Sequence, residues 1–536
     1  MRGADLIVRT LSAAGVDTIY SLSGNQIMPI YDACVDAGIR LIHTRHEGAA
    51  VYMADAHAQL TGGVGIALVT AAPGFASAVG PLYMARMAES PIVLLSGDSP
   101  LSQDSMGAFQ ELDQVAISAP LCKAAFRPAN AADLGDDMAR ALRIAAAGRP
   151  GPVHVALPFD LLNEEVGEVD LPGVDALTAP VAAPDSDAVK TILDTLATAD
   201  RPAVITGPAL NRTRRPGLAD KLTAALDAPV ICMESPRGLA DPSLGDFAGT
   251  LATADAIVVI GKSIDFTTGF GKSPTFAEAA RIVVVDPDDD ALGRAKRAFG
   301  ARLVLAHQAD AVATAIALAE TPPANTDRAD WRARMAAAMA ARAAEPAEAG
   351  PGPMRPAVLC AAVQRLLDAA DDPILIVDGG EFGQWAQASV AASARIINGP
   401  SGAIGGCLCY AVAAKIARPD ATVVVLMGDG TAGFHFAEFE TAHRYGADFV
   451  AVIGHDSRWN AEYQIQLRDY GEHRLNECEL NPTRYDLAAA GFGCHGDHVS
   501  DPADLNAALE RALASGLPAC VVGVIDGLPA PSGSGH

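Results

Sequence analysis

The sequence predicts an α/β protein built from three doubly wound parallel-sheet domains. Ten short apolar runs carry this prediction, and many of them end in Gly, Asp or Pro; residues 65–74, 281–287 and 422–430 are examples. Each is a continuous apolar run, which is typical of a strand buried on both faces of a sheet. Helical patterns separate most of the runs. Alternating strands and helices favour parallel sheets that are covered by helices.

Two stretches of biased composition divide the chain. Residues 163–187 are rich in acidic residues and Pro, and residues 343–356 are rich in Ala, Pro and Gly. Such composition marks domain boundaries. We therefore expect domains at 1–165, 185–335 and 355–530, each with its own α/β pattern. The length of 536 residues agrees with about three domains.

The charge balance limits the classes of partner. The chain has 39 basic and 64 acidic residues, a formal net charge of -25, and no run of Lys or Arg. An acidic field repels nucleic acid and anionic membranes, so we predict neither as a partner. No apolar stretch reaches the roughly 18 residues that a membrane span needs. An anionic small substrate would need a local positive charge or a metal ion.

The cysteines point to a reducing compartment. Nine cysteines without regular spacing or a C-x-x-C motif do not form a disulfide framework. We therefore predict reduced thiols and a cytoplasmic location. Residues 1–16 follow an amphipathic helix pattern without a long apolar region, so they do not read as a secretory signal.

The sharpest motif follows an apolar run and reads Gly428-Asp429-Gly430, with a helical pattern and a second run that ends near Asp456. With Gly433 the glycines satisfy G-x-G-x-x-G, which alone indicates a dinucleotide site. Asp429 argues against that interpretation, because a carboxylate in this turn repels a pyrophosphate unless a cation lies between them. Mg²⁺ would resolve the conflict, since Asp429 and Asp456 supply hard oxygen ligands and a diphosphate can complete the shell. The following helix N-terminus would offer N–H groups to the same anion.

This arrangement resembles the thiamine-diphosphate-dependent enzymes. In that family the metal is held by the Asp of GDG, a later Asn or Asp, and the carbonyl two residues beyond. The residues that match the family's metal and diphosphate positions are Asp429, Asp456, the Arg458 backbone, Gly428, Gly430 and Thr431. The chain departs from the family in reading His455-Asp456, where Asn-Asn or Asn-Asp is commoner. Asp remains a good Mg²⁺ ligand but adds negative charge.

Two further segments resemble the family's cofactor-binding regions. Residues 41–74 resemble the pyrimidine-binding domain and include Pro73 among the cofactor positions. Glu47 matches the glutamate that protonates N1′ of the cofactor, a role that needs a low-dielectric pocket. Within 398–417, Ile404 matches the apolar wedge between the cofactor rings. Gly402 would offer its carbonyl to the 4′-amino group.

A fourth stretch concerns the substrate. Residues 106–114 resemble the Phe-Gln-Glu stretch of the acetolactate synthase-like branch, which faces the substrate, and Gln110 is our candidate there. The branch also includes benzaldehyde lyase and 2-hydroxyacyl-CoA lyases. The resemblance covers nearly the whole chain. It implies a pyrimidine-binding domain, a Rossmann-like middle domain and a diphosphate-binding domain, in that order.

The resemblance implies a thiamine-diphosphate- and Mg²⁺-dependent carboligase or decarboxylase that acts on 2-oxo acids. In the family the two halves of the site, here near Glu47 and Asp429, meet across a subunit interface. We therefore expect a homodimer or homotetramer with shared active sites. Relatives use the middle domain for FAD or a nucleotide or leave it empty, and the sequence does not choose, so FAD is left open.

Three alternatives stay open on the sequence alone. A 2-hydroxy-ketone or 2-hydroxyacyl-CoA lyase would use the same cofactor in the cleavage direction. An NAD- or FAD-dependent oxidoreductase would follow from the dinucleotide interpretation of 428–433. A non-catalytic regulatory subunit would keep the fold without the chemistry, but the presence of Glu47 and Asp429 argues against it.

Overall fold

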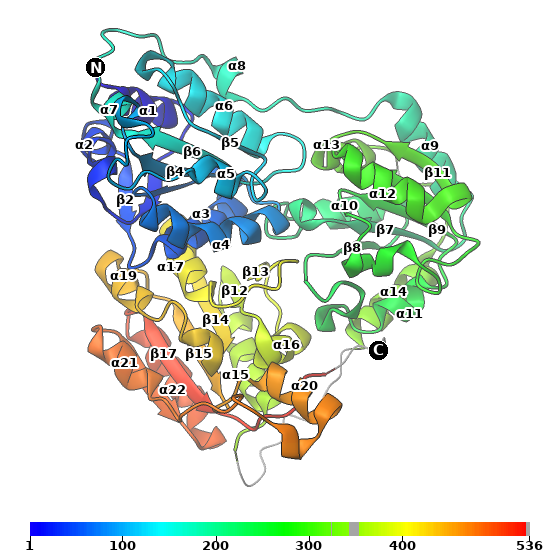
Figure 1. The fold of residues 1–536 in the computed structure, drawn as a ribbon. Helices are drawn as coiled ribbons and strands as arrows, with labels where there is room; N and C mark the ends of the chain where they lie inside the picture. Colours follow the sequence, from blue (N-terminus) through cyan, green and yellow to red (C-terminus); the bar gives the residue numbers. More distant parts are fainter. Residues whose placement is uncertain (323, 342–352, 532–536) are drawn as a thin grey trace. The chain divides into compact units, whose positions relative to one another are not determined.

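The chain folds into three parallel α/β sheets, as a computed structural model that describes residues 1–322, 324–341 and 353–531 shows (Figure 1). The prediction of three doubly wound parallel-sheet domains is confirmed. Contacts group the chain into two compact units, Met1–Pro180 with Val412–Ala417, and Val181–Ala411 with Arg418–His536. The linker predicted at 343–356 lies largely outside the described residues. Within those residues no helix is long and apolar enough to cross a bilayer, and all nine cysteines are free thiols.

The first unit holds a six-stranded sheet of order β2-β1-β3-β4-β6-β5. Its strands are β1 Thr18–Ser21, β2 Arg40–His43, β3 Gly65–Val69, β4 Ile92–Asp98, β5 Ala124–Phe126 and β6 Val153–Pro158. Strand β3 is buried along its whole length, which explains its continuous apolar sequence. Its Ile66 and Leu68 pack in one core with α1 (Gly3–Ala13), α2 (Met28–Ala37) and α6 (Leu134–Ala146). Helix α3 (Glu47–Thr61) also contacts β3 and packs against α4 (Pro73–Met87).

A fully buried imidazole lies on β6, the strand between β4 and the edge strand β5. His154 of β6 bonds through Nε2 to Ser96 Oγ at 2.8 Å and through Nδ1 to Ser118 Oγ at 2.7 Å. Its ring also stacks on Phe75, with centroids 4.7 Å apart. Burial lowers the pKa of His154 to about 3, because the charged imidazolium would lose its hydration. The folded protein therefore holds this side chain neutral.

This imidazole predicts a component of acid sensitivity. Because its pKa is lower when folded than when unfolded (about 6.5), its contribution is complete above that unfolded value and falls as the pH drops toward 3. At pH 5 the loss should be about 2 kcal/mol relative to pH 7.5. Urea unfolding should therefore show that the free energy of unfolding of the wild type exceeds that of His154→Gln at pH 7.5. This difference should be about 2 kcal/mol smaller at pH 5. Parallel pH dependences in the two proteins would contradict this account.

The second unit begins with a five-stranded sheet of order β11-β10-β9-β7-β8. Its strands are β7 Pro202–Thr206, β8 Val230–Cys232, β9 Ala256–Ile260, β10 Arg281–Val285 and β11 Leu303–His307. Alternate residues of β9 enter two different cores, Ile257 and Val259 on one face and Val258 and Ile260 on the other. The helices of the first core are α11 Phe247–Leu251, α12 Asp289–Phe299 and α14 Ala329–Ala340; those of the second are α9 Ser186–Ala197, α10 Leu218–Leu226 and α13 Ala311–Ala319.

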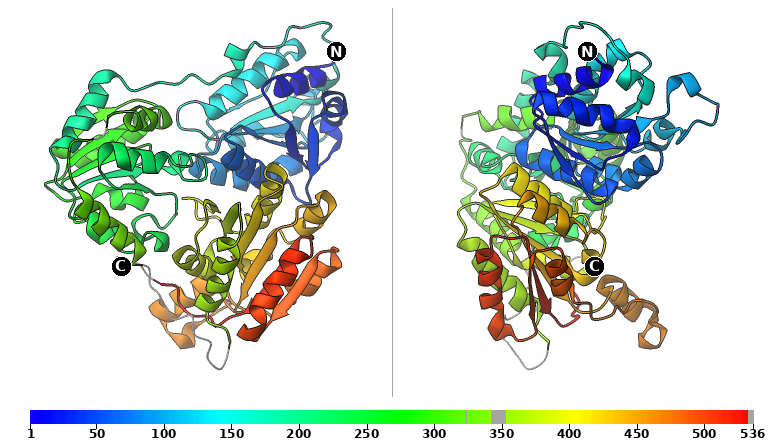
Figure 2. Two further views of the ribbon diagram at one scale, coloured as in Figure 1. Left: turned by 180° about the vertical axis from the view of Figure 1, so that it is seen from behind. Right: turned by 90° about the vertical axis from the view of Figure 1, so that its left-hand side faces the viewer.

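The last sheet has the order β13-β12-β14-β15-β17-β16, which repeats the pattern 2-1-3-4-6-5 of the first. Its strands are β12 Pro373–Val377, β13 Ala394–Ile397, β14 Thr422–Gly428, β15 Val450–His455, β16 His495–Val499 and β17 Ala519–Val524. Helices α15 (Pro356–Asp368), α16 (Gly380–Ser389) and α22 (Leu505–Ala514) share one core with it. Helix α20 (Asn460–Tyr470) extends away from this sheet (Figure 2, right).

Candidate active site

The turns that follow β14 and β15 are joined through one buried carboxylate. Asp429 follows Gly428 at the start of the short α18 (Asp429–Ala432), and it is 2% exposed. Its Oδ1 accepts a hydrogen bond from the Gly430 N–H at 2.9 Å, and its Oδ2 accepts one from the Ser457 N–H at 2.8 Å. The Tyr485 hydroxyl donates to the Asp429 carbonyl at 2.8 Å. These bonds fix Asp429 beside the turn that carries Asp456.

The carboxyl groups of Asp429 and Asp456 both have raised pKa values. Burial and the charge of Asp429 raise the pKa of Asp456 to about 7. Burial also raises the pKa of Asp429, although the His455 imidazole, 3.4 Å from its carboxylate, opposes that effect. Two like charges in a poorly hydrated site are unfavourable unless a cation compensates them.

The remaining donors suit a hard divalent cation. The Arg458 N–H donates to Asp456 Oδ1 at 3.1 Å, which turns the chain tightly after β15. In the described part of the chain the Arg458 carbonyl accepts no hydrogen bond. The described part of the chain also contains no group of three His, Cys, Asp or Glu side chains that could hold a metal without further ligands. Two carboxylates and one free carbonyl therefore fit Mg²⁺ only with oxygens from a ligand, such as a diphosphate.

All the site residues predicted in the second unit line one cavity of about 190 Å³. These residues are Gly402, Ile404, Gly428, Asp429, Gly430, Thr431, Asp456 and Arg458. The carboxyl ends of β12 to β15 contribute most of the lining, which is where doubly wound sheets bind ligands. Packing at Gly430 is close, since an added Cβ would lie 2.7 Å from the Trp459 ring. A larger residue at position 430 would collide with that ring.

Sequence reasoning missed the residue that holds the Ile404 loop. Asp378 follows β12 and is fully buried, and burial raises its pKa. Its carboxylate accepts hydrogen bonds from the Gly379 N–H at 2.7 Å and from the Gly405 N–H at 3.0 Å. Gly405 has φ of 87°, and an added Cβ there would lie 2.4 Å from Phe434. The only signal in the sequence was an acid followed by two glycines at a strand end.

We predict that Asp378→Asn weakens the binding of thiamine diphosphate, the cofactor that the resemblance implies, by roughly 10-fold or more. An amide cannot accept both N–H groups with the strength of a carboxylate, so the loop that bears Ile404 loses its anchor. A tryptophan-fluorescence titration with thiamine diphosphate and Mg²⁺ would measure the change. Asp372→Asn is the matched control, because Asp372 pairs with Arg418 at the other end of β12. Equal affinities in both variants would contradict the role of Asp378.

In the first unit, two predicted residues lie together at the carboxyl edge of the sheet. Glu47 is the first residue of α3 and is half-buried, and Pro73 is the first residue of α4. The His46 imidazole caps α3 by accepting a hydrogen bond from the Gly48 N–H at 3.0 Å. A Cβ added to Gly74 would lie 3.4 Å from Glu47 Oε1, so the start of α4 closely approaches this carboxylate. Within this unit Glu47 keeps partial exposure, whereas the predicted role needs a low-dielectric pocket.

Gln110 is tied to the same edge through a second glutamine. Gln26, which is 5% exposed, donates from Nε2 to Gln110 Oε1 at 2.7 Å. Thr70 donates from Oγ1 to Gln26 Oε1 at 2.9 Å. These two hydrogen bonds join the loops after β1, β3 and β4. Gln110 adopts a left-handed backbone with φ of 60°. The first unit thus brings Gln110 to the sheet edge that carries Glu47 and Pro73.

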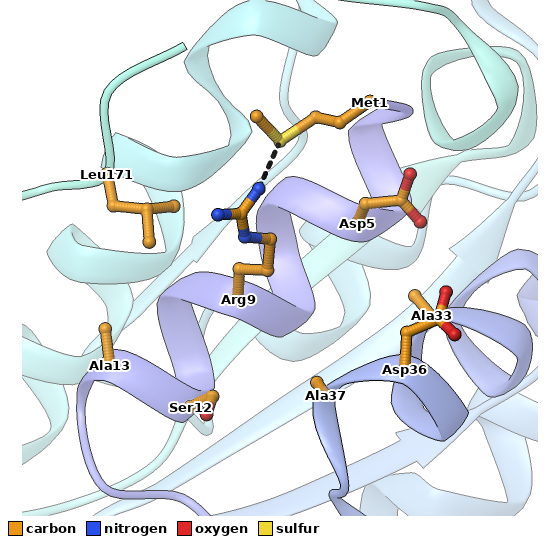
Figure 3. A pocket seen from close by; sticks show the side chains of 9 residues that line it. All are labelled: Met1, Asp5, Arg9, Ser12, Ala13, Ala33, Asp36, Ala37 and Leu171. Carbon is orange, nitrogen blue, oxygen red and sulfur yellow. Dashed lines mark hydrogen bonds between the residues drawn. The ribbon is translucent and has the colours of Figure 1, made fainter. Parts of the chain in front are cut away.

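A larger cavity of about 610 Å³ lies elsewhere in the first unit, beside α1 and α2 (Figure 3). Its lining includes Met1, Asp5, Arg9 and Leu171, and none of the predicted site residues. Two of its charged groups have contacts of their own, since Asp5 pairs with Arg2 at 2.7 Å and Arg9 Nη1 lies 3.7 Å from the Met1 sulfur. This cavity offers no arrangement for catalysis.

Comparison with known proteins agrees with the geometry. Family models for thiamine pyrophosphate enzymes match the chain in three parts: an N-terminal TPP binding domain at 1–117, a central domain at 189–316 and a C-terminal TPP binding domain at 378–522. The chain is 34% identical to a probable acetolactate synthase of Mycobacterium bovis over 535 residues, which cover 97% of this chain and 95% of that protein. It is 30% identical to 2-hydroxyacyl-CoA lyase 2 of Homo sapiens, over 92% of this chain and 84% of that one.

Proposed function

We propose that this chain, which belongs to the thiamine pyrophosphate enzyme family, is a thiamine-diphosphate- and Mg²⁺-dependent enzyme acting on 2-oxo acids. In this proposal it removes CO₂ from one substrate and joins the remaining acyl unit to a second carbonyl, as an acetolactate synthase does. The observation that carries it is the pair of buried Asp429 and half-buried Asp456 in one cavity with Ile404. The similarity to a probable acetolactate synthase supports the substrate class.

Each residue has a defined part in this proposal. Asp429, Asp456 and the Arg458 carbonyl would hold Mg²⁺, and the turn of Gly430 and Thr431 at the start of α18 would meet the diphosphate. Thiamine diphosphate, when bound, supplies a carbon centre that accepts the electron pair left by the departing carboxylate. Buried Asp378 fixes the loop of Gly402 and Ile404, so that this loop keeps its shape against the cofactor rings.

The first unit supplies the acid–base part of the proposal. Glu47, the first residue of α3, would exchange a proton with the cofactor pyrimidine. Gln110, held by Gln26, faces the substrate. We further propose that two subunits share each active site, in a homodimer or homotetramer. The domain boundaries 1–165, 185–335 and 355–530 and the cytoplasmic location also stay predictions.

A second candidate is a 2-hydroxyacyl-CoA or 2-hydroxy-ketone lyase, which the similarity to 2-hydroxyacyl-CoA lyase 2 favours. It would use the same cofactor and the same residues in the cleavage direction. The oxidoreductase alternative has no such support, because the matching family models are thiamine pyrophosphate domains.

The test uses protein that has been stripped with EDTA and dialysed. Incubation with pyruvate, with and without thiamine diphosphate and Mg²⁺, is followed by proton NMR. Acetolactate or acetoin that forms only with both additions would support the proposal, and acetaldehyde alone would indicate simple decarboxylation. Unchanged pyruvate would remove it as the donor. Benzoin and a 2-hydroxyacyl-CoA, assayed side by side, would then test the lyase.

A further inference from the structure

One guanidinium at the candidate site, that of Arg237, makes no hydrogen bond with the described residues. Arg237 lines the 190 Å³ cavity and also a neighbouring one of about 210 Å³, which Gly379, Gly380 and Gly402 border too. Across residues 1–322, 324–341 and 353–531, its guanidinium makes no hydrogen bond or ion pair. The other arginine of the cavity, Arg458, lies over the Tyr463 ring at 4.4 Å. Arg237 therefore presents an exposed guanidinium with unused hydrogen-bond donors at the site.

The loop that carries Arg237 is held firmly. It follows β8, and the Ser235 hydroxyl accepts a hydrogen bond from the Arg237 N–H at 3.2 Å. A Cβ added to Gly402 would lie 3.9 Å from Pro236, so the loop touches the segment that bears Ile404. On the other side, Gly238 packs against Thr267, where an added Cβ would lie 2.0 Å from a backbone oxygen.

A buried ion pair fixes the base of this loop to the last sheet. Arg395 of β13 donates to Glu234 Oε1 from Nη2 at 2.6 Å and from Nε at 3.1 Å. Asn211 donates to the other Glu234 oxygen at 2.7 Å. Two planar groups in this geometry hold a defined orientation. The position of Arg237 relative to Gly402 and Ile404 is thus set by the fold rather than by the side chain alone.

The guanidinium of Arg237 lies in a site that is otherwise rich in carboxylates. The protein carries a net charge of -25, which repels an anionic substrate at long range. The cavity adds the carboxylates of Asp429, Asp456, Glu381 and Glu462. Burial raises the pKa of Glu381, and the nearby positive charge of Arg237 opposes that effect, but no hydrogen bond or ion pair joins the two side chains in the described part of the chain. An anion that enters here meets the Arg237 guanidinium, whose N–H groups make no hydrogen bond within the described residues.

We infer that Arg237 binds the carboxylate of the 2-oxo acid substrate and thereby selects acids over neutral ketones. This inference rests on the proposed function. A guanidinium fork matches a carboxylate in two parallel hydrogen bonds, which gives orientation as well as affinity. Arg237 would act in binding and orientation of the substrate, and the metal charge would serve the diphosphate.

The test compares Arg237→Gln and Arg237→Lys in the full-length protein loaded with thiamine diphosphate and Mg²⁺. Calorimetric titration with oxamate, an unreactive isostere of pyruvate, should give a dissociation constant raised roughly 10- to 100-fold in Arg237→Gln and less in Arg237→Lys. The KM for pyruvate should rise in parallel with little change in kcat, whereas the dissociation constant of neutral acetoin, measured by the same titration, should stay the same. Arg297→Gln, which removes an exposed charge at the end of α12, is the matched control.

Each outcome separates the inference from the proposed function. Unchanged oxamate affinity in Arg237→Gln, or no oxamate binding by the wild type, would overturn the inference even if pyruvate is turned over. A weaker affinity for thiamine diphosphate in Arg237→Gln would assign the residue to the cofactor instead and would also overturn it. Oxamate binding that depends on Arg237, without turnover of any 2-oxo acid, would keep Arg237 as a carboxylate-binding residue but would remove the proposed function, and with it the assignment of that carboxylate to a substrate.

Discussion

Asp429→Asn should fold like the wild type but bind thiamine diphosphate with Mg²⁺ more than about 100-fold more weakly. Even residues that only orient metal ligands change affinity by about 10- to 100-fold, so loss of an anionic ligand should exceed that range. The amide keeps one oxygen that can accept a hydrogen bond from the Gly430 or Ser457 N–H. It loses the charge that attracts the cation. A fluorescence titration at fixed Mg²⁺, with urea unfolding of the apoprotein, would separate binding from folding.

The neighbouring acid provides a matched control inside the same site. Asp456→Asn should keep binding within about 10-fold, because an amide oxygen still serves a hard cation and one like charge beside Asp429 is removed. In the thiamine-diphosphate-dependent enzymes that the sequence resembles, the position of Asp456 holds Asn or Asp. Equal losses in the two variants would contradict the distinct roles of the two acids. Tight binding of thiamine diphosphate and Mg²⁺ by Asp429→Asn would contradict the proposed metal site.

Most of the fold was predictable because its sequence signals are local. Val258 and Val259 point to opposite faces of β9 and enter two different cores, so only a continuous apolar run can satisfy both faces. The turn of Asp429 was also predictable, since a carboxylate between two glycines at a strand end conflicts with a phosphate unless a cation is present.

The contacts that could not be predicted join residues far apart in the chain. Asp378 accepts a hydrogen bond from the Gly405 N–H, 27 residues further along the chain. The helical and strand periodicities of a sequence do not predict such a bond. Gln110 is likewise held by Gln26, 84 residues distant. Arg237 gives no signal at all in the sequence, because its importance comes from its place in the cavity, where its guanidinium makes no hydrogen bond with the described residues. Sequence patterns thus locate the ligands, whereas the groups that position them become visible only in three dimensions.

Glu47→Gln should reduce kcat by roughly 100- to 10,000-fold, the range of a lost general acid–base group. The glutamine keeps the size and the hydrogen-bonding capacity of the side chain at the start of α3 but cannot exchange a proton with the pyrimidine. Cofactor affinity should therefore change only a few-fold. Exchange of the cofactor C2 proton with D₂O, followed by NMR, should slow together with turnover. Asp136→Asn is the control, because Asp136 is an exposed acid in the first turn of α6. Near wild-type turnover in Glu47→Gln would refute the proposed activation.

The same variant tests whether two subunits share the active site. If Glu47 of one chain serves Asp429 of another, a mixed dimer of Glu47→Gln and Asp429→Asn chains contains one intact site and one doubly altered site. Random reassociation of equal amounts should then restore about a quarter of wild-type activity, although each variant alone is inactive. A site formed within a single chain would show no recovery, because every chain in the mixture carries one of the two changes. Recovery on mixing would thus connect the two units functionally and assign Glu47 and Asp429 to different subunits.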